Sequence, residues 1–464
     1  MALAEKIYKL SPHPLQTLFL NAYSSILYLE RYGKKFWKLS EEFEANQWRP
    51  IAELEADQNE KLKKLIQHAY EHVPYYRKKM QLAKLTPKDV QSKADLYKFP
   101  LLTKDDIRNN TAALISTKYP KYLLRSGHTS GTTGSPLQFY YDIHTCVVHH
   151  VADWRQKYWA GLEYGQPYAS LQGRVIVPMS QKKPPFWRKN YLNNQLFLSS
   201  FHLHEKNLPY YFEKLRKDKI RFIEGYPSNI YILALYLLKN KETFPLSGIL
   251  TSSETLFDFQ REAIESTFLC PIYDFYGMAE RVMFATECEA HEGHHINLDY
   301  GMTEILNSDY EPVPVGTPGK MVATSLHNFA MPLIRYETND VCALKRSTCS
   351  CGRSFPLMDD VATKNEAIIS LPDGRLISPS VLTHPFKPMH NIAASQIIQE
   401  SLDLLRIKIV KRPGFSKEDE NKLIHAFHER LENQIKIEIE YVDLIPKTSS
   451  GKFKWVISKV KPTF

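Results

Sequence analysis

The middle of the chain repeats one local pattern, in which a short apolar run ends in small polar residues and a helix-forming segment follows. The apolar runs lie near 220–224, 249–251 and 271–275, and the residues after them read Gly-Tyr-Pro-Ser, Ser-Ser-Glu and Tyr-Gly-Met-Ala-Glu. Strands that alternate with helices form parallel sheets, and ligands bind where the carboxyl ends of such strands meet. The repeat therefore predicts an α/β fold with a ligand site at the polar tips, and it predicts Ser228 as a helix N-cap.

A segment rich in glycine and hydroxyl side chains precedes this repeat. Residues 129–137 read Thr-Ser-Gly-Thr-Thr-Gly-Ser-Pro-Leu and are followed by a strand-like run at 138–141. Glycine lets the backbone approach a bulky anion closely, and hydroxyl and backbone N–H groups can donate to phosphate oxygens. The segment is not a Walker loop, because Gly-Lys-Ser/Thr does not follow at the required spacing. Composition alone leaves both a phosphate-binding loop and an ordinary polar hairpin loop open.

The order of these residues resembles the phosphate-binding signature of the adenylate-forming superfamily, which includes acyl-CoA synthetases, adenylation domains of peptide synthetases and luciferases. Other motifs follow in that family's order. Residues 276–280 are similar to Tyr-Gly-x-Thr-Glu, residues 335–340 to Arg-Tyr-x-Thr-Gly-Asp, and residues 446–452 to the C-terminal Pro-x4-Gly-Lys loop. Residues 73–77 and 99–106 are similar to the phenylacetate-CoA ligase branch, within which the chain resembles capsular polysaccharide biosynthesis and coenzyme F390 synthetase-type proteins.

This resemblance implies an α/β fold with two parts: a large N-terminal domain of several subdomains with mainly parallel sheets and helices, and a small, mobile α+β C-terminal domain. We expect a helical region over 1–100, the adenylate-forming core over 101–362 and the C-terminal domain over 363–464. Thr103 is expected to cap a helix in the core. With 464 residues and 43% apolar content, the chain can bury a full core.

The resemblance also implies ATP and Mg²⁺ as cofactors and assigns residues to them. Lys452 would reach the carboxylate substrate and the α-phosphate, Thr129 would act beside it, and Glu280 would hold Mg²⁺, a hard cation that prefers oxygen ligands. Tyr276 would pack on the adenine, and Asp340 would accept both ribose hydroxyls. The full set expected to bind the nucleotide is Ser130, Gly131, Thr132, Thr133, Gly134, Ser253, Glu254, Tyr276, Gly277, Asp340 and Lys364.

The chain departs from the family pattern at residue 339 and in the segment 362–366. Asn339 stands where the family has glycine, a change that the tolerance of Asn for positive φ allows. Residues 362–366 read Ala-Thr-Lys-Asn-Glu, whereas the family joins its two domains at a hinge of the form Gly-Arg-x-Asp-Asp. Lys364 supplies a charge there but lacks the planar fork of arginine. The departure leaves open whether a second, thioester-forming half-reaction takes place.

A cysteine and histidine pattern suggests a metal site. Cys349 and Cys351 lie two residues apart, downstream of Cys288 and of His294 in a His-His pair. Three thiolates and one imidazole make a tetrahedral set for structural zinc. Similar segments occur in the phenylacetate-CoA ligase branch, where some members bind zinc. We therefore expect Cys288, Cys349 and Cys351 as zinc ligands together with one of His291, His294 and His295, of which His294 is the preferred choice, with buried or free thiols as the alternative.

Charge and hydropathy limit the partners. The net charge of +9 favours anionic ligands, but the basic residues are dispersed and no nucleic-acid-binding signature is present. No apolar run is long enough to span a membrane, and no signal-peptide layout is present, so a cytoplasmic protein is expected. Residues 15–29 predict a helix packed on the body, with a peripheral helix at the inner membrane surface as the alternative. Residues 178–194 predict a basic surface loop, which could instead contact a lipid or an anionic glycan of a polysaccharide assembly.

The implied chemistry is attack of a carboxylate on the α-phosphate of ATP, which gives an acyl-adenylate and pyrophosphate. The acyl group would then pass to CoA, an amine or a hydroxyl, with capsular or surface polysaccharide biosynthesis as the expected context. Two alternatives stay open. One is a degenerate, non-catalytic nucleotide-binding protein of a polysaccharide assembly, and the other is a transferase that uses a different nucleotide-activated substrate. The sequence identifies neither the acyl substrate nor the oligomeric state.

Overall fold

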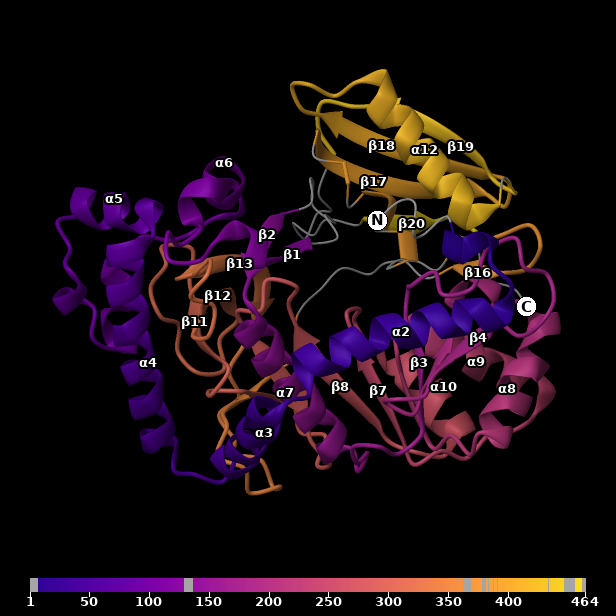
Figure 1. The fold of residues 1–464 in the computed structure, drawn as a ribbon, viewed down its shortest axis with the longest axis horizontal. Coiled ribbons are helices and arrows are strands. Elements are labelled where there is room, and N and C mark those ends of the chain that lie inside the picture. The colour runs from indigo at the N-terminus through magenta and orange to yellow at the C-terminus, as the bar shows by residue number, and fades with distance from the viewer. Residues whose placement is uncertain are drawn as a thin grey trace.

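The structure is a computed structural model that describes residues 7–128, 137–359, 361, 369–377, 381–382, 384–386, 388–389, 391–432, 434–445 and 455–460. Figure 1 shows a large body of helices and sheets with a smaller α+β unit, formed by the end of the chain, beside it. The predicted fold class is confirmed, with a large N-terminal domain and a smaller C-terminal domain.

Long helices form the first part of the chain. They are α2 (His13–Arg31), α3 (Lys34–Asn46), α4 (Ile51–His72) and α5 (Pro74–Leu82). In α4, the buried side chains Leu62, Leu65, Ile66 and Ala69 follow the spacing that places residues on one helix face. The helix expected over 15–29 is α2, which lies against the body as predicted but turns much of its apolar side outward.

Short 3₁₀ turns and a capped helix lead into the core. The elements here are η1 (Pro87–Asp89), η2 (Lys93–Lys98), α6 (Lys104–Leu114), η3 (Lys121–Leu123) and the hairpin of β1 (Arg125–His128) and β2 (Gln138–Tyr141). Thr103 caps α6 as predicted: its hydroxyl accepts from the Asp106 backbone N–H at 3.1 Å, and the Asp106 carboxylate accepts from the Thr103 backbone N–H. This reciprocal pair satisfies N–H groups that the first helical turn leaves without partners.

A nine-stranded sheet forms the centre of the large domain, in the order β14-β10-β9-β8-β7-β6-β3-β5-β4. The neighbours from β8 to β5 in this order are parallel, while the pairs at both edges are antiparallel. Its strands are β3 (Tyr168–Leu171), β4 (Trp187–Asn190), β5 (Gln195–Leu198), β6 (Phe222–Gly225), β7 (Gly248–Ser252), β8 (Ile272–Gly277), β9 (Phe284–Glu287), β10 (His294–Ile296) and β14 (Leu357–Met358).

Helices cover both faces of this sheet, as the alternating pattern requires. Aromatic and aliphatic side chains of α8 (Leu208–Lys217), α9 (Pro227–Asn240) and α10 (Asp258–Phe268) form one buried cluster with the strands. A second cluster joins α3 and α7 (Ile143–Trp159) to the strands. Helix α9 begins at Pro227, so its N-cap is Tyr226 rather than Ser228.

The predicted loop at 178–194 is only partly a loop, because residues 187–190 form the edge strand β4. The reason is that Arg188 and Asn190 are buried while Trp187 and Lys189 are only partly covered, an alternation that suits one strand of a sheet. Three further 3₁₀ turns in the described part of the chain are η4 (Ser200–His202), η5 (Glu205–Asn207) and η6 (His384–Phe386).

Three smaller sheets follow in the described part of the chain. In the large domain, β11 (Gly301–Leu306), β12 (Gly319–Ser325) and β13 (Tyr336–Cys342) form an antiparallel sheet. The C-terminal domain contains the pair β15 (Ile369–Ser370) and β16 (Leu376–Ile377), followed by β17 (Ile392–Ser401), β18 (Leu404–Lys411), α12 (Lys417–Leu431), β19 (Lys436–Tyr441) and β20 (Val456–Ser458). Its four-stranded sheet is ordered β19-β18-β17-β20, and Phe201 of the large domain packs into its core.

Candidate active site

The predicted polar tips meet at one edge of the large sheet. Strands β6, β7 and β8 are parallel neighbours, with Gly225 paired to Thr251 and Ser252 paired to Phe275. The residues that follow these strand ends therefore leave the sheet on the same side. Ser253, Glu254, Tyr276 and Gly277, all predicted to bind the nucleotide, lie at this edge.

Tyr276 and Asp340 are in direct contact, although they come from different sheets. The Tyr276 hydroxyl at the end of β8 donates to Asp340 Oδ2 on β13 at 2.7 Å. Burial and the neighbouring Asp340 carboxylate raise the pKa of Tyr276 well above its usual value. The phenol therefore stays protonated and remains a donor to the carboxylate.

Glu280 and Tyr336 form a second contact between the same two segments. The Tyr336 hydroxyl on β13 donates to Glu280 Oε1 at 2.7 Å, and the Glu280 side chain is buried. Burial and Glu280 together raise the pKa of Tyr336 well above its usual value. The sequence analysis did not assign a role to Tyr336, although it stands within the motif at 335–340. The contact fixes one oxygen of the carboxylate that was predicted to hold Mg²⁺.

Local contacts explain why a glutamate stands at position 254 and a glycine at position 277. Glu254 Oε2 accepts from the Ser228 backbone N–H at 3.1 Å, so the carboxylate lies at the positive N-terminal end of α9. A side chain at Gly277 would place its Cβ 2.9 Å from the Phe275 ring, so the packing there requires glycine. Ser253, directly before Glu254, takes a positive φ of 70°.

The remaining predicted nucleotide contacts lie outside the described residues. These are Thr129, Ser130, Gly131, Thr132, Thr133 and Gly134, together with Lys364 and Lys452. The structure describes the two strands that flank residues 129–134, β1 and β2, and it pairs His128 with Gln138. In β2, the Tyr141 ring lies 3.8 Å from the guanidinium of Arg281, the residue directly after Glu280. The hairpin is thus held close to the turn that carries the predicted Mg²⁺ ligand.

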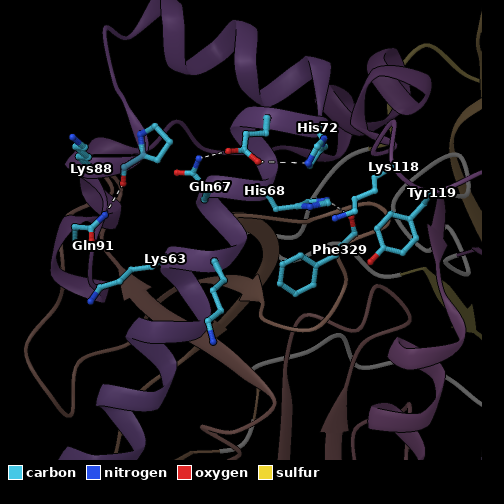
Figure 2. Close-up of a pocket in the computed structure, with 12 residues that line it drawn as sticks. Lys63, Gln67, His68, His72, Lys88, Gln91, Lys118, Tyr119 and Phe329 are labelled. Carbon is cyan, nitrogen blue, oxygen red and sulfur yellow. Dashed lines mark hydrogen bonds and ion pairs between the residues drawn. The ribbon is translucent and has the colours of Figure 1, made fainter.

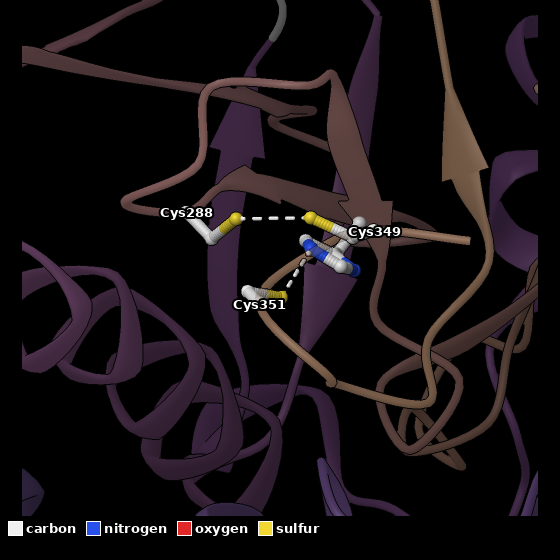
Figure 3. Close-up of side chains that lie close together, drawn as sticks. Cys288, Cys349 and Cys351 are labelled. Atoms are coloured by element: carbon white, nitrogen blue, oxygen red, sulfur yellow. Dashed lines mark hydrogen bonds between the residues drawn. The ribbon is translucent and has the colours of Figure 1, made fainter. Parts of the chain in front are cut away.

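A cluster of three cysteines and one histidine is formed by the residue after β9, by strand β10 and by the segment between β13 and β14. Figure 3 labels its three cysteines. Cys288 Sγ lies 3.5 Å from Cys349 Sγ, and Cys351 Sγ lies 3.4 Å from His295 Nε2. All four ligand atoms lie within 4.8 Å of one another. Four ligands of one tetrahedral zinc ion lie roughly 3.8 Å apart, so the donor set and its spacing fit such an ion.

The histidine of this cluster is His295, and not His294 as the sequence analysis expected. Adjacent residues of a strand point to opposite faces, so only one of the pair can face the cysteines. His294 Nε2 lies 3.3 Å from Asp274 Oδ2 on the other side. His295 Nδ1 lies 3.0 Å from the Phe355 carbonyl oxygen, which can only accept. Nδ1 therefore carries the proton, and the lone pair of Nε2 faces the sulfur atoms.

A separate hollow of about 590 Å³ lies beside α4 and contains none of the predicted site residues (Figure 2). Lys63 and Lys88 stand on one side of it and Lys118 on the other. His68 and Phe329, which also line it, contact each other through the imidazole Nε2 and the Phe329 carbonyl oxygen at 2.9 Å. The polar groups of this hollow are dispersed around an open depression and do not converge on a point, so the sheet edge is the better candidate site.

Comparison with known sequences gives relatives along nearly the whole chain. Residues 369–459 match the family described as the CapK C-terminal domain. The chain is 27% identical to the protein CapK of Staphylococcus aureus, over 98% of this chain and 99% of that one. It is 24% identical to a phenylacetate-coenzyme A ligase of Thermus thermophilus, over 88% of this chain and 97% of that one. A phenylacetate-coenzyme A ligase of Escherichia coli is 26% identical, over 83% and 90%.

Comparison with solved structures gives the same architecture. The 2-hydroxyisobutyryl-CoA ligase in complex with 2-HIB-AMP and CoA, in the thioesterification state, superposes with a TM-score of 0.60 at 20% identity. The match covers 89% of this chain and 91% of that one. The same enzyme in the postadenylation state gives a TM-score of 0.57. At this level of identity, the likeness concerns the fold.

Proposed function

We propose that the chain belongs to the adenylate-forming superfamily, on the branch that contains CapK and the phenylacetate-CoA ligases, and that it activates a carboxylate with ATP. In the first step, a carboxylate oxygen attacks the α-phosphorus, the bond to the β-phosphate bridging oxygen breaks, and pyrophosphate leaves. In the second step, an acceptor attacks the acyl carbon and AMP leaves. The chain is accordingly an adenylate-forming ligase.

The observation that carries this proposal is the pair of contacts between the turn after β8 and strand β13. Tyr276 donates to Asp340, and Tyr336 donates to Glu280, so an aromatic ring and two carboxylates are held in fixed relation. We assign Tyr276 to the adenine and Asp340 to the ribose hydroxyls, for which a carboxylate is a suitable acceptor. With its orientation set by Tyr336, Glu280 would present its second oxygen to Mg²⁺.

Glu280 would hold Mg²⁺, since a hard cation takes carboxylate oxygens. When bound, the ion supplies positive charge that neutralises the phosphates as pyrophosphate leaves. We assign the loop of Thr129 to Gly134 to the phosphates and Ser253, Glu254 and Gly277 to the nucleotide pocket. Lys452 would bind the substrate carboxylate and the α-phosphate, and Lys364 would lie near the ribose. Catalysis of this kind rests on positioning and charge stabilisation and needs no covalent enzyme nucleophile.

CoA is the acceptor that the relatives favour. Two named relatives are phenylacetate-coenzyme A ligases, and the neighbouring structure contains CoA with an acyl-adenylate. For the second step, we propose that the C-terminal domain, divided from the core near residue 362, changes its orientation. The name CapK supports a role in capsular polysaccharide synthesis, and a cytoplasmic location fits the use of ATP and CoA. The acyl substrate is a small-molecule or glycan carboxylate.

We also propose a structural zinc ion at the Cys288, His295, Cys349 and Cys351 cluster. Protein side chains would fill all four coordination positions of the ion. No position would stay open for a substrate or water, which marks the site as structural rather than catalytic. The loop that carries two of these cysteines is tied to the N-terminal helices, because Arg353 Nε donates to Gln47 Oε1 at 2.7 Å and Ser354 N donates to the Gln47 carbonyl oxygen. Zinc would hold this loop to β9 and β10.

The assignment of the lysine is tested with Lys452→Ala and with Lys447→Ala as a control in the same segment. AMP release with an accepted carboxylate should fall about a hundredfold or more in Lys452→Ala, because a charged group that contacts the transition state is lost, and should be unchanged in the control. ATP binding, followed by the shift in melting temperature, should persist in both. Full AMP release by Lys452→Ala would overturn the assignment of this lysine.

A further inference from the structure

Helix α2 lies on the surface of the molecule with a row of apolar side chains turned toward solvent. Its outward side carries Leu15, Leu18, Phe19, Tyr23, Ile26 and Leu29, and of these Leu18 and Ile26 are 59% exposed and Leu29 is 80% exposed. These positions recur every three or four residues, so they form one continuous stripe along the helix. Figure 1 shows α2 on the outside of the large domain, crossing in front of the central strands. A surface helix in water normally turns such a stripe inward.

The inward side of α2 is attached by polar groups. Gln16 Oε1 accepts from Arg188 Nε of β4 at 3.0 Å, and both side chains are buried. Asn21 Nδ2 donates to the Lys189 carbonyl oxygen at 2.8 Å, and Asn21 Oδ1 accepts from the Tyr191 backbone N–H at 2.9 Å. These bonds, at two successive turns of the helix, fix its rotation. Because these bonds fix the rotation of α2 relative to β4, they also determine that the apolar stripe faces outward.

The connection after β4 extends the apolar surface. Tyr191 is 71% exposed, and Leu192 beside it is also exposed. The bond from Tyr191 to Asn21 places this tip directly against α2. Tyrosine at the margin of an apolar surface suits the boundary between water and hydrocarbon, because its ring is apolar and its hydroxyl is polar.

A group of lysines follows the C-terminal end of this helix. Between His13 and Leu29 the helix contains no Asp, Glu, Lys or Arg, and Glu30 at its end is paired with Arg125. Directly after it, the exposed residues Lys34, Lys35 and Lys38 of α3 follow, together with the exposed ring of Trp37. The whole chain has a net charge of +9. Exposed Glu41 and Glu42 come next on α3, so the lysines form a local basic group at one end of the apolar stripe. Such a group beside an apolar surface is complementary to an anionic lipid surface.

We propose that α2, with Tyr191 and Leu192, is a docking surface for an anionic phospholipid bilayer. In the part of the chain that the structure describes, no helix has the length and hydropathy to cross a bilayer. Helix α2 would therefore lie in the plane of the interface, with its apolar stripe among the upper acyl chains and the α3 lysines near the headgroups. The positive charge favours an anionic surface over a second copy of this chain, which also has a net charge of +9. This inference does not depend on the chemistry at the sheet edge.

The test is flotation of the full-length protein with vesicles of phosphatidylcholine alone and of phosphatidylcholine with phosphatidylglycerol. The variants are Leu18→Glu and Ile26→Glu, with Leu82→Glu as a matched control, because Leu82 is 73% exposed on the distant helix α5. Exposed leucine and isoleucine can be replaced without opening a cavity, so all three variants should keep the wild-type melting temperature.

We expect the wild-type protein to float with the phosphatidylglycerol vesicles and to be released as salt is raised. Partition should fall about tenfold in Leu18→Glu and in Ile26→Glu, since each removes one inserted aliphatic side chain, and should not change in Leu82→Glu. Three results would overturn the proposal. They are no flotation of the wild type at low salt, equal flotation of Leu18→Glu, and a lipid-free dimer, seen by sedimentation velocity, that Leu18→Glu dissociates.

Discussion

The Tyr276 hydroxyl donates a hydrogen bond to the Asp340 carboxylate over 2.7 Å and so joins the end of β8 to β13 of a neighbouring sheet. In the second contact between the same two segments, the tyrosine, Tyr336, comes from β13 and the carboxylate, Glu280, from the turn after β8. Each segment thus supplies one tyrosine and one carboxylate. This reciprocal arrangement holds the predicted nucleotide contacts in place before any ligand is bound, which lowers the cost of ordering them.

Asp340→Asn should weaken ATP binding. The side chain keeps its size but loses the charge that favours two hydroxyl donors, a difference of about 1.5–3 kcal/mol for hydrogen bonds to a charged group. The KM for ATP should therefore rise about tenfold to a hundredfold. Glu337→Gln, on the opposite face of the same strand, is the control and should leave this KM unchanged. An unaltered KM in Asp340→Asn would remove Asp340 from the ribose site.

Tyr336→Phe should lower stability and change the dependence on Mg²⁺. It leaves the buried Glu280 carboxylate without its donor, at a cost of about 1–3 kcal/mol. The free Glu280 side chain should then require a higher Mg²⁺ concentration for half-maximal activity, measured by titration beside urea unfolding. Tyr310→Phe is the control. It removes a hydroxyl that donates to Glu337 at 3.1 Å on the partly exposed side of β13, so little change is expected. Equal Mg²⁺ dependence in both variants would contradict the proposed role of Glu280.

The two adjacent histidines should differ in zinc content. His295→Ala should lose the metal, measured by inductively coupled plasma mass spectrometry, and should melt at a lower temperature, because structural zinc contributes directly to folding. His294→Ala should keep one zinc ion per chain. Loss of zinc from His294→Ala alone would show that the ligand set is the one predicted from the sequence. A wild-type protein without zinc after expression in zinc-supplemented medium would contradict the site.

Arg155 and Asp299 form a buried ion pair that should support the large domain. Arg155 donates from both terminal nitrogens to Asp299 at 2.8 and 2.9 Å, and both side chains are almost fully buried. Arg155→Leu leaves Asp299 charged and buried, so the free energy of unfolding should fall by about 3–5 kcal/mol. Arg49→Leu breaks a pair with Asp57 at the surface and should cost less than about 1 kcal/mol. Urea unfolding of both variants makes the comparison.

The sequence predicts those parts of the structure that depend on local patterns. The strand tips at Ser253 and Tyr276 share one sheet edge because parallel strands connected by helices leave the sheet on the same side. Thr103 was identifiable as a cap because capping depends on residues within one helical turn. The order of the motifs predicts a resemblance to the phenylacetate-CoA ligase branch, and the relatives found by comparison include CapK and phenylacetate-coenzyme A ligases.

Features that depend on register and on distant partners were not predictable in the same way. A shift of one residue in β10 exchanges His294 and His295 between the two faces of the sheet, and no local pattern fixes that register. Tyr336 and Glu280 meet only when two sheets are packed together. The rotation of α2 depends on hydrogen bonds to β4, and β4 itself lies in a segment whose prolines and lysines predict a loop.

The most direct test of carboxylate activation is ATP–pyrophosphate exchange with pooled carboxylic acids, with and without Mg²⁺. Adenylation predicts exchange that requires one acid in a pool and Mg²⁺, and deconvolution of that pool would identify the substrate. Absence of exchange in every pool, including pools of acidic sugars, would contradict the account if a rise in melting temperature showed that the protein still bound ATP. That result would instead identify a nucleotide-binding protein without adenylation activity.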